Sequence, residues 1–422
     1  LRASLTFQRV SPVFVSTIEP LMRLAEVLTR TLVVYLASRF AVGTAMMMLR
    51  AAIAWHVFQL THSPFHLGLI GLVQFIPAFA LTLVAGALAD TADRRRIMMT
   101  AQLVALGCGL VLFVATANGT VTLGLLYALI AVAAMATAFD SPARMAFLPS
   151  LVGRAAFPRV ATIASTNQAL AFATGPALGG LLIADLGIAA AYAAYTVLIV
   201  VAIATLAVLP SPPAAPSGRG VNLAVIREGL HFVRSRPVVL GCMTLDMFAV
   251  IFGGAAALLP IYASEILQVG PRGYGLLSSA LEVGALVTSL ALITLPPIRH
   301  AGRALLIAVG LYGVATIVFG LSRSFPLSLA AYMLVGVADQ VSVVMRSTTI
   351  QLSTPDALRG RVSAVTLLFI GASNQLGAAE SGFLAAMTSA TFAVVSGGIA
   401  SLVVLAIVAI KLPELRLYRI DR

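Results

Sequence analysis

The sequence predicts an all-α integral membrane protein with twelve transmembrane helices in two six-helix halves. Of its 422 residues 60% are hydrophobic and only 10% are charged, whereas soluble domains carry about 25% charged residues. A helix needs about 20 apolar residues to cross a bilayer, and barrel strands would be much shorter and would alternate. Twelve runs have the length of a helix: 34–60, 66–89, 97–116, 121–143, 160–183, 187–209, 238–265, 274–295, 303–321, 326–345, 362–387 and 390–412.

The basic residues predict how these helices lie in the membrane. The net charge of +12 would suggest a nucleic-acid partner in a soluble chain. Here Arg50 falls well inside the first run and only Arg272 and Arg323 fall on one face, which leaves 24 of the 27 Lys and Arg residues at the termini, in the alternate loops or near the ends of the runs that adjoin them. Because cytoplasmic loops carry the excess of Lys and Arg, we expect both termini in the cytoplasm and no nucleic-acid partner.

A stretch rich in Pro and Gly divides the chain near its midpoint. Residues 210–220 contain four Pro and two Gly residues, which prevents a continuous helix. The apolar positions that follow, from Leu223 to Val233, have helical spacing; they fit either a short helix on the anionic inner leaflet or a partly ordered linker. The predicted domains are a cytoplasmic leader, two six-helix halves on either side of a linker, and a cytoplasmic tail, at residues 1–33, 34–209, 210–237, 238–412 and 413–422.

The two halves resemble each other in sequence. At an offset of 202 residues, Arg144 aligns with Arg346 and Gly175 aligns with Gly377. We interpret the two arginines as interfacial anchors, since they occupy matching helix ends. A parallel repeat of this kind predicts a substrate site near the membrane midplane between the halves.

A charged loop joins the second and third runs. Its sequence Gly-x-x-x-Asp-x-x-x-Arg-Arg, formed by Gly86, Asp90, Arg94 and Arg95, stands between two apolar segments. On its charges alone the loop sets membrane topology. The pattern also resembles the loop between the second and third helices of major facilitator superfamily transporters, although Thr91 stands where that family usually has a basic residue.

This resemblance implies the major facilitator fold and a conformational latch. It implies that Asp90 interacts with the start of the helix near Arg361, where a helix N-terminus attracts an anion. It also implies that Arg94 pairs with Asp140, that Gly86 and Arg95 belong to the same latch, and that these contacts hold the outward-facing state. The alternative is a loop that serves topology only.

A second motif lies in the fifth run. Gly175, Pro176, Gly179 and Gly180 permit close helix approach and a bend. They resemble the Gly-x-x-x-Gly-Pro-x-x-Gly-Gly signature of facilitator exporters, with Ala171 in place of the first Gly. The resemblance implies export, whereas ordinary packing of small residues is the alternative interpretation.

Other segments resemble one branch of the superfamily. They include Leu67-Gly68-Leu69, residues 139–144, residues 258–262 and residues 359–365. That branch is the bacterial transmembrane secretion effector group, which is similar to enterobactin exporters, and the resemblance covers about residues 35–415. Relatives often have Pro at the position of Glu282 and Glu at the position of Ala378, which weakens Glu282 as a shared coupling residue.

A few polar residues within the helices are candidates for transport chemistry. An ionisable group at the middle of a membrane helix raises the free energy of insertion by about 2.5–3.5 kcal/mol, so each such residue is expected to have a structural or functional role. Asp246 is the first candidate for a proton-carrying or substrate-facing acid, followed by Glu282 and Glu380. Arg50 could attract an anionic substrate, and Asn374 offers hydrogen bonds. For each of them the alternative is a structural ion pair or hydrogen bond inside the bundle.

No feature of the sequence indicates an enzyme, a metal or a cofactor. There is no phosphate-binding Gly-x-x-x-x-Gly-Lys-Ser/Thr loop, and the five histidines are scattered. Cys108 and Cys242 both fall inside predicted helices and are most simply small apolar residues.

The sequence therefore predicts a monomeric secondary transporter in the cytoplasmic membrane of a bacterium. By resemblance it would expel a siderophore or drug-like molecule by proton antiport, with alternating access to a cavity between the halves. Two alternatives remain open: a proton-coupled importer of a small solute, and a non-transporting membrane sensor or scaffold.

Overall fold

The computed structural model describes residues 29–152, 156–210, 223–296 and 298–420. Most of the predicted leader and most of the Pro-rich linker lie outside these residues. Within them, twelve helices are long and apolar enough to cross a membrane, as the sequence predicts. Helical structure suits this environment because all backbone groups of a helix, apart from its ends, are hydrogen-bonded internally.

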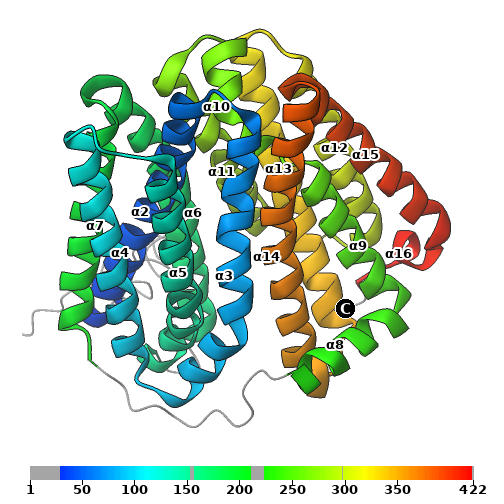
Figure 1. The fold of residues 1–422 in the computed structure, drawn as a ribbon. Helices are drawn as coiled ribbons and strands as arrows, with labels where there is room; N and C mark the ends of the chain where they lie inside the picture. Colours follow the sequence, from blue (N-terminus) through cyan, green and yellow to red (C-terminus); the bar gives the residue numbers. More distant parts are fainter. Residues whose placement is uncertain (1–28, 153–155, 211–222, 297, 421–422) are drawn as a thin grey trace, which may run out of the picture.

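Six helices form the first bundle, on the left in Figure 1. Side chains cap several of them: Thr29 accepts a hydrogen bond from the Leu32 amide, and Asp93 accepts bonds from the amides of Arg95 and Arg96. Gly187, at φ 84°, permits the tight turn between the last two helices. The helices are α2 (Arg30–Thr61), α3 (Pro64–Thr91), α4 (Arg94–Ala117), α5 (Leu123–Leu151), α6 (Phe157–Leu186) and α7 (Ile188–Val208).

The second bundle has the same number of spans, but its first span is interrupted. Helix α9 (Pro237–Phe252) ends at Gly253, and the path continues through η1 (Ala255–Leu258), α10 (Leu259–Ile261) and the π-helical η2 (Tyr262–Ile266). The hydroxyl of Tyr312 donates to the carbonyl of Gly253 at 3.2 Å, which satisfies one backbone group at the break. The remaining spans are α11 (Gly270–Thr294), α12 (Ala301–Leu321), α13 (Phe325–Leu352), α14 (Asp356–Met387) and α15 (Ala390–Lys411).

Two short helices lie at one end of the second bundle. They are α8 (Leu223–Ser235), which packs against α14, and α16 (Pro413–Leu417), which packs against α12 and α9. We call this the linker end; it also contains the end of α7 and the start of α4. The opposite end, where α2 ends at Thr61 and α11 begins at Gly270, is the far end.

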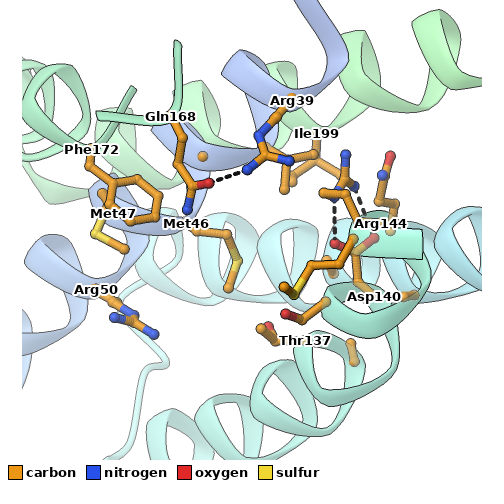
Figure 2. Close-up of a pocket in the computed structure, with 18 residues that line it drawn as sticks. Arg39, Met46, Met47, Arg50, Thr137, Asp140, Arg144, Gln168, Phe172 and Ile199 are labelled. Carbon is orange, nitrogen blue, oxygen red and sulfur yellow. Dashed lines mark hydrogen bonds and ion pairs between the residues drawn. The ribbon is translucent and has the colours of Figure 1, made fainter. Parts of the chain in front are cut away.

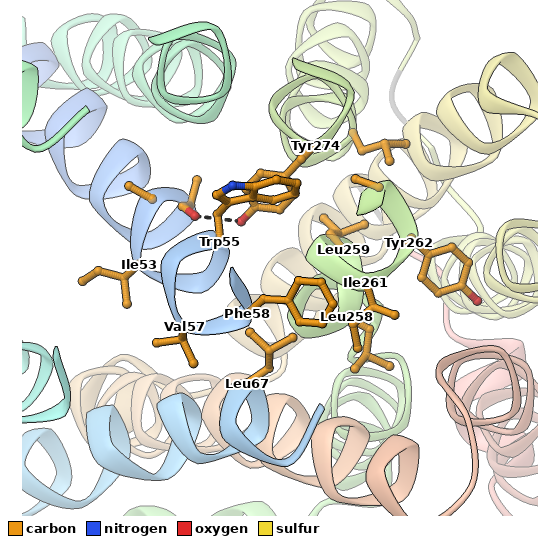
Figure 3. Packing of buried hydrophobic residues seen from close by; sticks show 14 of the residues in the cluster. Ile53, Trp55, Val57, Phe58, Leu67, Leu258, Leu259, Ile261, Tyr262 and Tyr274 are labelled. Carbon is orange, nitrogen blue, oxygen red and sulfur yellow. Dashed lines mark hydrogen bonds between the residues drawn. The ribbon is translucent and has the colours of Figure 1, made fainter. Parts of the chain in front are cut away.

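Among the residues that the structure describes, the two bundles share a hydrophobic core only toward the far end. There one cluster joins Trp55, Phe58 and Leu67 of the first bundle to Leu258 and Tyr274 of the second (Figure 3). At the linker end the buried residues form two separate clusters, one in each bundle. The packing therefore closes the far end and leaves the bundles without a common core at the linker end.

Glycines bring the helices of the two bundles into close approach. Helix α6 meets α11 at Gly180 and Gly275, and α3 meets α14 at Gly68 and Gly382. At these positions even a Cβ atom would meet backbone of the opposite helix, at 2.6 Å from the Gly275 Cα for a Cβ on Gly180. Small residues at both contacts therefore let the backbones of the two helices pack directly against each other.

Candidate functional site

A cavity of about 350 Å³ lies within the first bundle. Helices α2, α4, α5, α6 and α7 all contribute to its wall. In Figure 2, Phe172 and Met47 lie beside each other with Arg50 below them, whereas Arg144 and Asp140 lie on the other side of the view. The principal lining residues are Arg39, Met46, Met47, Arg50, Gln102, Thr137, Asp140, Arg144, Met145, Gln168 and Phe172.

Two polar contacts fix the guanidinium groups nearest the linker end. Arg39 donates to the side-chain carbonyl of Gln168, which joins α2 to α6 (Figure 2). Arg144 donates two hydrogen bonds to Asp140, each of 2.9 Å, within α5. The bidentate geometry is the strong form of an arginine–carboxylate pair.

Several buried polar atoms in this wall lack a protein hydrogen-bond partner. They are both amide atoms of Gln102, the Nε of Arg39 and the Nη1 of Arg144. Gln102 is only 2% exposed. Because a buried polar group without a partner is costly, water or a polar ligand in the cavity would stabilise these atoms.

Arg50 connects this cavity to the second bundle. Its side chain is exposed in the cavity, and it lies within electrostatic range of Glu282 on α11. Glu282 in turn interacts with Asp339 on α13. Arg50 and Glu282, both expected from the sequence, therefore interact between the two bundles, whereas Asp339 lies inside the second bundle, within electrostatic range of Glu282.

Asp246 lies in a different environment, inside the second bundle. Its carboxylate forms an ion pair with Arg346 of α13. A small cavity of about 10 Å³ is lined by Asp246, Asp339, Tyr312 and Ser342. Asp246 is thus held by a partner instead of facing the larger cavity.

The expectation that Arg144 and Arg346 are interfacial anchors is wrong. The residues are 8% and 4% exposed, respectively, and each guanidinium is paired with a buried or half-buried carboxylate. An anchor would extend toward lipid headgroups and water, whereas these two arginines neutralise acids within the bundles.

The other two cavity candidates are not part of either charge cluster. Glu380 accepts a hydrogen bond from the neighbouring Ser381 hydroxyl at 3.2 Å. The amide of Asn374 donates to the carbonyl of Ile370 at 2.9 Å, within the same helix, and the residue is exposed. Their contacts are local to α14.

Sequence reasoning missed Arg39, Gln102 and Asp339. Arg39 and Asp339 stand within the apolar runs 34–60 and 326–345, so the criterion that selected Asp246 applies to them equally. No pattern in the sequence distinguishes Gln102, because its importance comes from burial against a cavity formed by other helices.

The predicted latch is described only in part. The surroundings of Gly86 and the side chain of Asp90 lie outside the part of the chain that the structure describes. Arg94 donates to the carbonyl of Ala146 at 3.2 Å, and Arg95 donates to the carbonyls of Leu206 and Ala207 at the end of α7. Asp140 is engaged by Arg144 in this conformation, so the proposed Arg94–Asp140 pair stays a prediction.

The glycines of the second motif contact two different helices. Gly175 and Gly179 pack against Met48 of α2, and Gly180 packs against Gly275 of α11. The carbonyl of Pro176 also lies beside Gly275. The motif therefore joins helix packing inside the first bundle to the contact between the bundles.

Comparison with known proteins agrees with this architecture. Residues 20–420 match the family of transmembrane secretion effectors. The chain is 26% identical over 392 residues to the enterobactin exporter EntS of Escherichia coli, with 92% of both chains covered.

Solved structures show the same fold at low sequence identity. A POT family transporter in complex with 5-aminolevulinic acid has a TM-score of 0.73 at 12% identity, covering 92% of this chain and 96% of its own. A bacterial homologue of the human lysosomal transporter Spinster, in an inward-facing and unoccupied conformation, has a TM-score of 0.67 at 13% identity, covering 92% and 97%. These proteins are transporters and not enzymes. The chain is a multi-pass membrane transporter of the major facilitator superfamily and belongs to its transmembrane secretion effector family.

Proposed function

We propose that this protein is a secondary active exporter of a small organic molecule, a siderophore or drug-like compound, driven by proton antiport. The observation that carries the proposal is a cavity of about 350 Å³, with arginine and amide side chains in an otherwise largely apolar wall, in a two-bundle fold whose described residues form a common core toward the far end. A monomer suffices for this mechanism, because the cavity and both bundles belong to one chain.

The linker end faces the cytoplasm in this proposal. Nearly all basic residues lie at that end or at the termini, and the positive-inside rule places them in the cytoplasm of a bacterial inner membrane. The structure then corresponds to an inward-facing conformation, because the bundles separate at the linker end and pack together at the far end.

Alternating access requires the far-end contacts to break while contacts at the linker end form. The close approaches of Gly180 to Gly275 and of Gly68 to Gly382 would open. We propose that Asp90, Arg94 and Asp140 then form the latch predicted from the charged loop, and that Asp140 exchanges Arg144 for Arg94. The charged loop would thus stabilise the outward-facing state.

Proton coupling is proposed to use Glu282 and Asp339 together with Arg50. These residues connect α2 of one bundle to α11 and α13 of the other. Protonation of either acid would therefore change the attraction between the two bundles, whose contact must rearrange during transport. Protonation of Glu282 would weaken its attraction for Arg50 and favour separation of the bundles. Asp246, held by Arg346, is the second candidate for the proton carrier.

Export is favoured over import by the likeness to an enterobactin exporter and by the motif around Gly175 and Gly180. The test uses inverted membrane vesicles from cells that contain the protein, with enterobactin and the cation ethidium as alternative probes, and transport of either one would show export. Exporter activity predicts uptake into inverted vesicles that is driven by an acidic interior and abolished by an uncoupler. Accumulation in intact cells driven by inward proton flow would support the importer instead, and binding without movement in liposomes would support the sensor or scaffold.

A further inference from the structure

We propose that the cavity of the first bundle selects organic anions. In this arrangement Arg39, Arg50 and Gln102 receive the anionic group, and Met46, Met47 and Phe172 contact an apolar or aromatic body. The inference deepens the proposed function and depends on it for its physiological meaning, since it names the chemical class of the transported molecule.

The charges of the cavity favour an anion. Its wall contains three arginines and one acid, and that acid, Asp140, is already bound twice by Arg144. Arg39 is hydrogen-bonded to the neutral amide of Gln168, so this contact leaves its positive charge uncompensated. Glu282 from the second bundle can neutralise only the single positive charge of Arg50. The site therefore keeps an excess of positive charge even when Glu282 is ionised.

The polar atoms without partners point to the same ligand chemistry. Arg39 Nε and Arg144 Nη1 are donor groups, and the amide of Gln102 supplies an NH2 donor group and a carbonyl acceptor. Carboxylate, sulfonate, phosphate and ionised phenol oxygens are acceptors that would satisfy these donors, and hydrogen bonds to charged groups are stronger than neutral ones. The Gln102 carbonyl could accept from a hydroxyl or amide on the same molecule. A cation would satisfy none of the three donors.

The rest of the wall suits an apolar body of variable shape. Met46, Met47 and Met145 are flexible and polarisable side chains that adapt to different outlines. Phe172 supplies an aromatic face beside Met47 (Figure 2). The cavity thus combines a specific requirement for charge with a tolerant requirement for shape.

The test compares two probes that share the naphthalene body and differ in the charge of the sulfur-containing group. Naphthalene-2-sulfonate and the neutral naphthalene-2-sulfonamide are titrated into the purified full-length protein in lipid nanodiscs, and binding is measured by calorimetry. We expect the sulfonate to bind about tenfold more tightly or better, as expected for one hydrogen bond to a charged group. Arg39→Gln and Arg50→Gln should each remove most of this preference.

Controls separate charge recognition from loss of structure. Arg303→Gln changes an exposed arginine of α12 outside the cavity and should leave the preference intact. Arg50→Lys keeps the charge and should retain much of the binding if the variant protein folds. Equal affinity for both probes, no binding of either, or a preference that survives both cavity substitutions would overturn the inference.

Failure of this inference and failure of the proposed function give different results. If ethidium is exported with a proton gradient but the sulfonate does not bind, the chain is an exporter and the anion assignment is wrong. If the sulfonate binds through Arg39 and Arg50 but proteoliposomes move neither it nor enterobactin, the anion site stands and the exporter assignment fails.

Discussion

The carboxylate of Asp246 on α9 forms an ion pair with the guanidinium of Arg346 on α13, and both side chains are less than a tenth exposed. The pair spans two helices of the same bundle, next to Asp339, Tyr312 and Ser342. A buried pair of this kind contributes little net stability compared with apolar residues, whereas removal of one partner leaves an uncompensated buried charge. This relationship makes the role of Asp246 accessible to experiment.

Asp246→Asn should destabilise the protein, because it leaves the guanidinium of Arg346 without its counter-charge. The loss expected on breaking a buried pair is about 3–5 kcal/mol, which thermal denaturation in detergent would show as a clearly lower Tm. The double substitution Asp246→Asn with Arg346→Gln should recover much of the loss, since both charges are then removed.

Transport by that double variant separates a structural role from proton coupling. If Asp246 carries the proton, the double variant should exchange substrate down its gradient but should not respond to a pH gradient. Proton-driven transport at the wild-type rate would assign the pair a purely structural role.

Glu282→Gln should uncouple transport and strengthen anion binding. The substitution removes the charge that attracts Arg50 across the bundles, so the guanidinium becomes more available to a ligand. We expect tighter binding of naphthalene-2-sulfonate and a loss of the response to a pH gradient in proteoliposomes. Glu414→Gln, at an exposed position near the C-terminus, is the matched control. If Glu282→Gln binds the sulfonate and responds to a pH gradient as Glu414→Gln does, Glu282 has no coupling role.

Gly180→Ala should favour separation of the bundles at the far end. Its Cβ would lie 2.6 Å from the Gly275 Cα and from the Pro271 carbonyl oxygen. Because both atoms belong to the backbone of α11, this clash is relieved only if the two helices move apart. Spin-label distances between α3 and α14 across the far end should therefore increase. Gly107→Ala is the control, because a Cβ there meets no atom within 4 Å, and unchanged distances in both variants would show that the contact is not the seal.

The membrane orientation can be tested with two single-cysteine substitutions. Asn118→Cys places a thiol at the far end, and Arg96→Cys places one at the linker end, where the native side chain is 88% exposed. The native Cys108 and Cys242 are buried and should react slowly. A membrane-impermeant maleimide applied to intact spheroplasts should label the first variant, and the second only after permeabilisation. The reverse pattern would invert the proposed topology.

The sequence by itself determined the membrane class, the twelve spans and the family. These features depend on local composition and on motifs, since each span must be apolar over about 20 residues whatever its neighbours are. The sequence also singled out Arg50, Glu282 and Asp246, because a charge within an apolar run is conspicuous.

Only the tertiary structure decided which of these charges meet. It buried Arg144 and Arg346 against carboxylates, although the sequence suggested exposed anchors. It also assembled Arg39, Gln102 and Gln168 from three different helices around one cavity. Partners across helices depend on the rotation and packing of each helix about its axis, which many weak contacts set together, and no short segment of the sequence contains that information.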